Sequence, residues 1–351
     1  MASALVLTVV LWGCGPATPV AKTAPAGPVG PPNSATVRPA AGCGGAALTT
    51  RFYDVGQALA VLVELPDGRT ILVDTGEHAE RAGCGGPCQE WSDHLLAGLQ
   101  RDLADRPIDM LWITHQHSDH LGGAPAVFGQ HQVEHYVDNG TRLETKLVTA
   151  ARAAAEAHGT PVTVVDPTHQ MSPLPSSASV TITAVVPEVW PRRCDRHPND
   201  CSIGLRIDYC EASILFTGDA EQAEEATLDL TSPVTLLQVP HHGSATSSSP
   251  ALLDQAAPRY AVISAAGPNE GTNRTYCHPR RSTVERLSER LGDRTSTMKA
   301  FAGNSCRNST PADWIDVPAS TRLFSTSRDG DVVLTTTGDG TFTQVNPRAS
   351  R

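Results

Sequence analysis

Short apolar runs separated by turn residues dominate the chain from residue 49 onward. The segments TTRFYDV, LAVLVEL and TILVD are typical of strands, and PDG at residues 66–68 predicts a hairpin turn between the second and the third. Val284, Leu287 and Leu291 are spaced three and four positions apart, which predicts a helix with one apolar face at residues 280–292.

Further strands and single helices follow along the chain. Strands are predicted at residues 108–114, 133–137, 161–165, 179–186, 203–209, 213–219, 234–240, 260–266, 321–326, 331–337 and 341–345. Helices are predicted at residues 92–104, 142–158 and 220–230. Because the strands form meanders that single helices interrupt, we expect an α+β fold in which helices cover two β-sheets from outside, an αββα four-layer sandwich.

Composition and charge limit the function classes. The 351 residues are 40% hydrophobic, which is enough for a sizeable core, and 18% are charged. The formal net charge of -10 lacks the basic footprint of proteins that grip nucleic acid through many phosphates. A role on nucleic acid would therefore have to rest on a local site.

The N-terminal segment has the pattern of an export signal. Residues 1–14 contain an apolar run from Leu5 to Trp12 that is too short to span a bilayer and is typical of a signal-peptide core. The sequence LWGC resembles a bacterial lipobox, which implies a lipid on Cys14; a plain cleaved signal or an uncleaved cytosolic start are the alternatives.

The residues after this signal are rich in Pro, Gly and Ala. Residues 15–47 are predicted to be a flexible tether, and residues 48–345 the folded domain. We expect an exported protein that a lipid on Cys14 anchors to the cell envelope, or else a secreted or periplasmic one. The lipid would be its only membrane contact, and no obligate protein partner is expected.

The cysteines fit an oxidising compartment. Without Cys14, eight of the nine remain, an even number that suggests disulfides. Cys84 with Cys88 and Cys194 with Cys201 are plausible local bridges, and Cys277 with Cys306 would close a longer loop, but the sequence leaves the pairing open. Zinc binding by Cys84 and Cys88 is the alternative, but no second close pair completes a four-thiolate site.

Residues 114–123, THQHSDHLGG, carry the densest chemistry. In extended backbone, His115 and His117 point to the same side, while Asp119 and His120 can turn toward a second position as the chain enters the next element. Imidazole and carboxylate suit zinc, manganese or iron, and such a site activates water when a coordination position is open. The alternative is a histidine-rich solvated loop.

This run resembles the T-H-x-H-x-D-H-x-G-G signature of the metallo-β-lactamase fold superfamily. The resemblance implies an active site at one edge of an αββα sandwich, with two divalent metal ions, zinc first and manganese as the alternative. It implies that His115 and His117 bind the first ion, whereas Asp119 and His120 bind the second.

Two strand ends resemble further motifs of the superfamily. TILVDTG implies that Asp74 orients the site, and SILFTGD implies that Asp219 bridges both ions. A strand-end aspartate before glycine is by itself more often a turn residue. The order and spacing of both segments around the histidine run support the resemblance.

Other segments resemble positions near the metals. PHHGS implies that His242 binds the second ion and that His241 faces the substrate; a buried structural pair is the alternative. His278, in CHP, would contact the leaving group or a phosphate. The candidate catalytic residues are therefore Asp119, His241, His278 and Asp74. In HPNDCS, the ligand for the first ion stays open among His197, Asn199 and Asp200, beside the alternative of a solvated loop.

Over residues 50–340 the chain resembles, segment by segment, the hydrolase domain of the ComEC family of competence DNA-uptake proteins, as a stand-alone, exported member. The resemblance starts at FYDVGQALA and ends at STSRDGDVVLTT. Where the family reads D-V-G-Q-G-D, Ala58 and Leu59 replace the Gly-Asp pair. Because that acidic residue borders the substrate region in the family, the replacement leaves the substrate open.

The implied chemistry is hydrolysis by a hydroxide that two metal ions activate. The first hypothesis is a phosphodiesterase or nuclease, with a small-molecule phosphodiester or a nucleic acid as the substrate. Alternatives are hydrolysis of an ester, thioester or lactam, and a non-catalytic module that binds extracellular DNA. The histidines outside the motifs are expected to be surface or packing residues: His78, His94, His131, His135, His158 and His169.

Overall fold

The structure is a computed structural model that describes residues 43, 45–141, 145–192, 194 and 196–345. The predicted signal peptide, the lipidation at Cys14 and the predicted tether up to residue 42 lie outside the described residues. All elements belong to one unit, residues 39–351.

Eight strands form the first sheet, in the order β16-β15-β1-β2-β3-β4-β5-β6. Strands β16 to β3 are antiparallel to their neighbours, and β3 to β6 are parallel. The strands are β1 Leu48–Phe52, β2 Val61–Glu64, β3 Thr70–Val73, β4 Met110–Trp112, β5 Tyr136–Asp138, β6 Val162–Val164, β15 Val332–Thr336 and β16 Thr343–Gln344.

Six strands form the second sheet, in the order β14-β11-β10-β9-β8-β7. Strands β7 to β9 are antiparallel, whereas β9, β10, β11 and β14 are parallel. The strands are β7 Val180–Val185, β8 Gly204–Tyr209, β9 Ala212–Phe216, β10 Leu236–Gln238, β11 Tyr260–Ile263 and β14 Leu323–Ser325.

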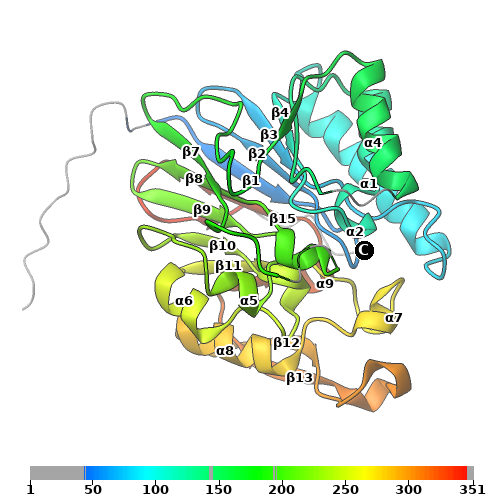
Figure 1. The fold of residues 1–351 in the computed structure, drawn as a ribbon. Helices are drawn as coiled ribbons and strands as arrows, with labels where there is room; N and C mark the ends of the chain where they lie inside the picture. Colours follow the sequence, from blue (N-terminus) through cyan, green and yellow to red (C-terminus); the bar gives the residue numbers. More distant parts are fainter. Residues whose placement is uncertain (1–42, 44, 142–144, 193, 195, 346–351) are drawn as a thin grey trace, which may run out of the picture. The chain divides into compact units, whose positions relative to one another are not determined.

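Helices cover the outer faces of both sheets (Figure 1). The first sheet carries α1 Gly86–Leu103, α3 Ala124–Gln130 and α4 Lys146–Ala157, and the second carries α6 Pro250–Ala256, α8 Arg281–Leu291 and the antiparallel hairpin of β12 Ser296–Phe301 with β13 Trp314–Ala319. The single-turn elements are α2 Ser118–Leu121, α5 Gln222–Glu225, α7 Asn273–Tyr276, α9 Thr326–Asp329, and the 3-10 turns η1 Pro198–Cys201, η2 Pro240–Gly243, η3 Cys306–Asn308 and η4 Pro311–Asp313.

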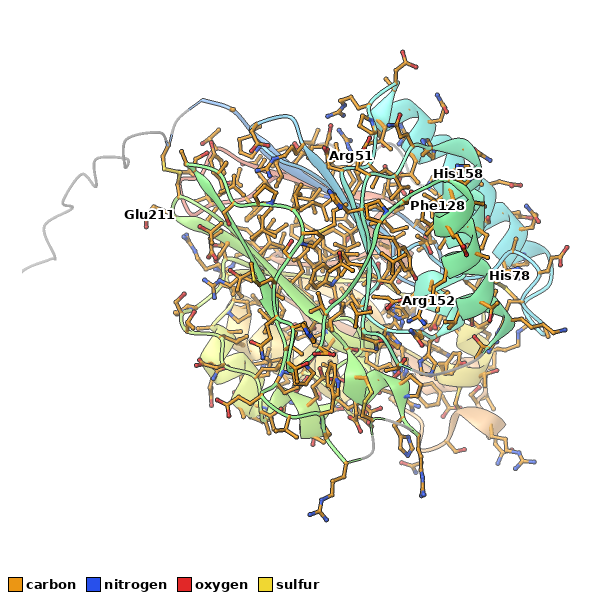
Figure 2. All side chains as sticks on the ribbon, turned by 45° about the horizontal axis from the view of Figure 1, so that its top comes forward. Arg51, His78, Phe128, Arg152, His158 and Glu211 are labelled. Atoms are coloured by element: carbon orange, nitrogen blue, oxygen red, sulfur yellow. A yellow bond between two sulfur atoms is a disulfide. The ribbon has the colours of Figure 1, made fainter. Side chains whose placement is uncertain are left out.

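Three apolar layers hold these elements together. Phe52 and Trp112 of the first sheet meet Phe216 of the second between the sheets, where Figure 2 shows densely packed side chains. Phe128 belongs to a layer under the helices of the first sheet, and Leu287 to one under those of the second. Each buried Phe or Leu contributes about 1.5–3 kcal/mol. The predicted αββα sandwich is therefore confirmed.

Some elements differ from those that the sequence predicts. The helix predicted at residues 220–230 is wrong beyond one turn, because α5 covers Gln222–Glu225 alone. The carboxylate of Glu225 accepts hydrogen bonds from the amides of Ser248 and Ser249, so tertiary contacts shape this segment. Helix α1 begins at Gly86, ahead of the predicted start. The strands β12 and β13 were not predicted.

Disulfides pair all eight cysteines of the described residues. Three pairs follow the predicted spacing, so the zinc alternative for Cys84 and Cys88 is wrong. The fourth, Cys43 with Cys210, joins the end of the predicted tether to the domain and was not predicted. Four disulfides are consistent with an extracytoplasmic location. No helix among the described residues is long and apolar enough to cross a membrane.

Candidate metal centre

The candidate site residues lie at the ends of parallel strands. Loops that follow β3 and β4 of the first sheet carry Asp74 and the run from His115 to His120, and loops that follow β9 and β10 of the second carry Asp219 and His242. Because the carboxyl ends of parallel strands share an edge, residues far apart in the sequence meet there.

Four side chains form the centre of the site. Asp119, His120, Asp219 and His242 each offer one ligand atom, and these atoms all lie within 4.8 Å of one another. His120 Nε2 lies 3.2 Å from Asp219 Oδ1, and His242 Nε2 lies 3.5 Å from Asp119 Oδ2. These residues are the set that the resemblance assigns to the second ion.

Hydrogen bonds orient both imidazoles. His120 Nδ1 donates to Asp74 Oδ2 at 2.7 Å, and Asp74 also accepts from the amide and hydroxyl of Thr114. His242 Nδ1 donates to the carbonyl of Ser264 at 2.8 Å. Both Nε2 atoms are therefore left with lone pairs, and these atoms face each other at 3.3 Å.

This donor set fits a divalent cation. Two lone pairs aimed at the same point repel each other unless a proton or a metal ion lies between them. Asp219 Oδ1 is buried and accepts no hydrogen bond among the described residues. Imidazole nitrogen and carboxylate oxygen are the ligands that zinc and manganese take in such sites.

His115 and His117 lie next to this cluster, and the ring centroids of His115 and His120 are 4.1 Å apart. His115 Nε2 is 3.0 Å from His117 Nδ1 and 3.9 Å from Asp219 Oδ2. The structure thus brings all six predicted ligands to one edge of the sandwich. The bridging role of Asp219 stays a prediction.

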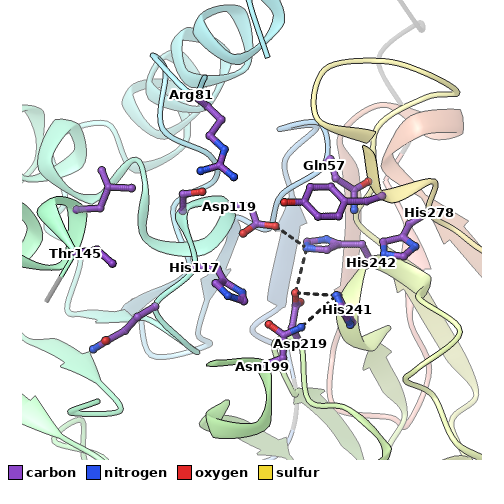
Figure 3. Close-up of a pocket in the computed structure, with 14 residues that line it drawn as sticks. Gln57, Arg81, His117, Asp119, Thr145, Asn199, Asp219, His241, His242 and His278 are labelled. Carbon is purple, nitrogen blue, oxygen red and sulfur yellow. Dashed lines mark hydrogen bonds and ion pairs between the residues drawn. The ribbon is translucent and has the colours of Figure 1, made fainter. Parts of the chain in front are cut away.

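The turn η2 separates the roles of its two histidines. Both have a left-handed backbone φ of 52°, a strained conformation for such residues that is found more often at functional sites. His242 reaches the four-residue cluster. His241 Nε2 lies 3.8 Å from Asp219 Oδ2 and 3.3 Å from Asn199 Nδ2 (Figure 3).

Of the three residues left open for the first ion, the structure brings Asn199 to the site. Asn199 lines the cavity, and its buried Oδ1 has no hydrogen-bond partner among the described residues. His197 is exposed and Asp200 is buried, and neither lines the cavity.

The electrostatics of the site favour a positive charge between the carboxylates. Burial by itself would lower the pKa of His120, but Asp219 and Asp74 raise it well above its usual value. Burial would raise the pKa of Asp219, but His120 and His242 hold it well below its usual value. Burial lowers the pKa of His115 well below its usual value, because the nearby carboxylates raise it by less than burial lowers it.

A cavity of about 330 Å³ opens over these residues. His278 lines it, as expected, and so do seven residues that the sequence did not assign to a site: Gln57, Arg81, Gln116, Ser118, Thr145, Leu147 and Tyr276. Of these, Gln57 belongs to the recognised D-V-G-Q segment, whereas Arg81 and Tyr276 lie in no motif. Leu59, which stands where the ComEC family has an aspartate, is buried in the core between the sheets. The six histidines outside the motifs do not line this cavity.

A family model described as the Metallo-beta-lactamase superfamily matches residues 53–267. Recombination protein 2 of Haemophilus influenzae is 29% identical over 238 residues, which are 67% of this chain and 26% of that protein. ComE operon protein 3 of Bacillus subtilis is 26% identical over 250 residues, which are 67% of this chain and 30% of that protein. The chain therefore matches less than a third of either relative's length.

Solved structures show weaker likeness. The metallo-beta-lactamase fold protein YhfI of Bacillus subtilis is 13% identical with a TM-score of 0.41, over 62% of this chain and 86% of that one. The short form of human tRNase Z is 15% identical with a TM-score of 0.38, over 62% of this chain and 92% of that one.

Proposed function

The chain belongs to the metallo-beta-lactamase superfamily, and from this membership and its His/Asp centre we propose that it is a metal-dependent hydrolase of phosphodiesters, a nuclease or phosphodiesterase. The observation that carries the proposal is the convergence of Asp119, His120, Asp219 and His242 on one point under an open cavity. The name of the Haemophilus relative refers to recombination, which favours nucleic acid over a lactam as the substrate.

The residues present would hold two divalent ions, zinc first and manganese as the alternative. His115 and His117 would serve one ion, Asp119, His120 and His242 the other, and Asp219 both. Bound there, such ions supply a hydroxide at neutral pH and stabilise the negative charge that develops on phosphate.

Other residues of the chain orient the site and move the proton. Asp74 and the Ser264 carbonyl keep the Nε2 lone pairs of His120 and His242 directed at the cluster. His241 lines the cavity, and its Nδ1 lies 3.5 Å from Glu221 Oε1. Burial lowers the pKa of His241, and the carboxylates of Asp219 and Glu221 only partly oppose this shift. His241 Nε2 is nevertheless the group that we assign to proton exchange with the leaving oxygen, because it lies in the cavity beside Asp219.

The test uses the full chain, its metal content, and four substrates. Single-stranded DNA, double-stranded DNA and bis(p-nitrophenyl) phosphate probe phosphodiester cleavage, and nitrocefin probes lactam cleavage. We expect cleavage of at least one phosphodiester, and its loss in His117→Ala with an unchanged circular-dichroism spectrum. His169→Ala, which changes an exposed histidine, is the matched control and should retain wild-type activity.

Each other outcome favours a different function. Cleavage of nitrocefin alone would assign a lactam hydrolase. DNA binding without any cleavage at full metal load would assign the non-catalytic module. A chain that binds no zinc and no manganese would overturn the metal centre and the proposed function together.

We also propose that the protein is exported and anchored by a lipid on Cys14. Its support is the lipobox-like LWGC sequence together with the four disulfides. Labelled fatty acid should be incorporated into the wild-type chain and not into Cys14→Ser. Incorporation of the fatty acid into Cys14→Ser would contradict the proposal of a lipid anchor on Cys14.

A further inference from the structure

The outer wall of the cavity carries a single basic side chain. Among the described residues that line it, Arg81 is the only arginine or lysine. Figure 3 shows its guanidinium directed from the loop after β3 toward Asp119. Arg81 lies outside the cluster of metal ligands, so its charge is available to a group other than the one that reacts.

Tyr276 meets Arg81 from another segment of the chain. Burial raises the pKa of the Tyr276 hydroxyl, and the charge of Asp119 adds to this shift, whereas the nearby Arg81 guanidinium opposes it. Arg81 Nε lies 3.7 Å from Glu77 Oε2, and the Arg81 side chain remains 41% exposed. The guanidinium therefore keeps donors that a ligand in the cavity can reach. We call Arg81 and Tyr276 together the outer rim.

The outer rim is held by buried packing. The amide of Arg81 donates to the His78 carbonyl, and its carbonyl accepts from the Cys84 amide, which places it between two turns. Cys84 is bonded to Cys88 and packs with Trp91 and Ala266, the latter in the segment that leads to Tyr276.

Trp91 connects the loops at the base of the rim. A Cβ on Gly271, in the segment before Tyr276, would lie 2.5 Å from the Trp91 ring, and one on Gly56, beside Gln57, would lie 2.4 Å from it. Both glycines thus pack directly against this ring. The rim is therefore pre-formed, which reduces the entropy cost of binding a ligand.

Three residues that line the same cavity each hold a buried polar atom without a partner in the described part of the chain. Gln57 Oε1, Gln116 Nε2 and His278 Nδ1 are buried and make no hydrogen bond among the described residues. An unpaired buried polar atom costs about 1–3 kcal/mol. The cavity is thus bordered by polar side chains as well as by charged ones, which suits a ligand that carries polar groups beside its charge, as a nucleotide does.

We propose that the outer rim binds a second phosphate group of the substrate, beside the one that reacts at the metal centre. The guanidinium presents paired donors that match phosphate, and the Tyr276 hydroxyl adds a further donor. The preferred substrate class is then a nucleotide or oligonucleotide with two neighbouring phosphates, rather than an isolated diester. This inference rests on the proposed function, because the second phosphate is defined as the one beside the phosphodiester that is cleaved at the metal centre.

Binding measurements test the rim without requiring turnover. Thymidine 3′,5′-bisphosphate and thymidine 5′-monophosphate are titrated by calorimetry into the manganese-loaded full chain. In Arg81→Gln we expect the Kd for the bisphosphate to rise about tenfold or more, since a hydrogen bond to a charged group contributes about 1.5–3 kcal/mol. The Kd for the monophosphate should change less than twofold, and the metal content should not change.

Matched variants separate binding from folding. Tyr276→Phe should raise the Kd for the bisphosphate about threefold, because one neutral hydrogen bond contributes about 0.5–1.5 kcal/mol. Arg281→Gln is the control, because Arg281 is also exposed and paired with a glutamate but lies on α8. Its Kd for both probes should equal that of the wild type.

The outcomes distinguish the rim from the reaction. Three outcomes would overturn the proposal that the outer rim binds a second phosphate. They are equal Kd changes for both probes in Arg81→Gln, no change for either probe in this variant, and a wild-type chain that binds neither probe. If Arg81→Gln loses the bisphosphate selectively while the wild type cleaves no phosphodiester, the rim is supported and the proposed function fails. With an oligonucleotide that the wild type does cleave, Arg81→Gln should raise KM and leave kcat unchanged.

Discussion

The carboxylate of Asp74 accepts a 2.7 Å hydrogen bond from His120 Nδ1, and both side chains are fully buried. This contact fixes which nitrogen of His120 carries the proton, so the lone pair of Nε2 is available to bind a metal ion. In Asp74→Asn we expect metal affinity to fall about 10- to 100-fold, the usual range for the loss of such a partner. Competition with a chelator measures the affinity.

The control for this variant is Asp105→Asn, which changes an exposed carboxylate after α1. Its metal affinity should equal that of the wild type. Asparagine tolerates the left-handed backbone of residue 74, where φ is 58°, so Asp74→Asn should fold. Wild-type affinity in a folded Asp74→Asn would contradict the orienting role.

The sequence predicted those parts of the site that local motifs encode. His115 to His120 are consecutive and follow a strand, so their chemistry was readable directly, whereas Asp219 and His242 were assigned through the family resemblance. Arg81 and Tyr276 escaped prediction because the two loops meet only in the fold, through Trp91 and a disulfide. The pairing of Cys43 with Cys210 was not evident for the same reason.

The strands were predicted more reliably than the short elements. Apolar runs such as residues 213–219 are buried on both faces. A short apolar run bounded by turn residues is typical of a buried strand, so its structure could be predicted from the sequence. The residues of β12 and β13 alternate less clearly, and the hairpin forms because it packs against α8. Likewise, the extent of α5 depends on amides of Ser248 and Ser249 that lie more than twenty residues away.

The two histidines of η2 should differ in metal binding. His242 points into the four-residue cluster, so His242→Ala should lower the number of tightly bound metal ions by one. His241→Ala should keep the wild-type metal content and lower kcat about 100-fold, in the range typical of a lost general acid. Atomic absorption and single-turnover kinetics measure both. Equal metal loss in the two variants would contradict the separation of roles.

Gly56 and Gly68 allow a comparison of packing with backbone strain. Both have a positive φ, of 72° and 88°, but a Cβ at residue 56 meets the Trp91 ring at 2.4 Å, whereas one at residue 68 meets open space. Gly56→Ala should therefore lower the free energy of unfolding by about 1–3 kcal/mol more than Gly68→Ala, the range for overpacking. Urea unfolding tests this, and equal losses would contradict the clash with Trp91.

The disulfides should contribute unequally to stability. Cys43–Cys210 joins residues 167 positions apart, and Cys84–Cys88 joins residues 4 positions apart. Because a cross-link restricts the unfolded chain more when its loop is longer, replacing both cysteines of the first pair by serine should cost about 5 kcal/mol, and of the second about 2 kcal/mol. Urea unfolding of both variants measures the difference; the reverse order would contradict this reasoning.

Asp54 should make stability depend on pH. Burial raises the pKa of Asp54 to about 6, and the carboxylates of Asp331 and Glu270 add to the shift. Since the unfolded value is about 3.9, the folded state holds the proton more tightly, and this contribution to stability is lost as pH rises from about 4 through about 6.

Asp54→Asn keeps residue 54 neutral at every pH, and asparagine can still accept the hydrogen bond that the Asp54 side chain takes from the Gly56 amide. Relative to the wild type, the variant should gain about 2–3 kcal/mol of unfolding free energy between pH 4 and pH 8, because one pKa unit corresponds to about 1.36 kcal/mol. Urea unfolding at both pH values measures the gain, with Asp316→Asn, an exposed carboxylate, as the control. A variant whose stability relative to the wild type is the same at pH 4 and pH 8 would show that the pKa of Asp54 is not raised in the folded chain.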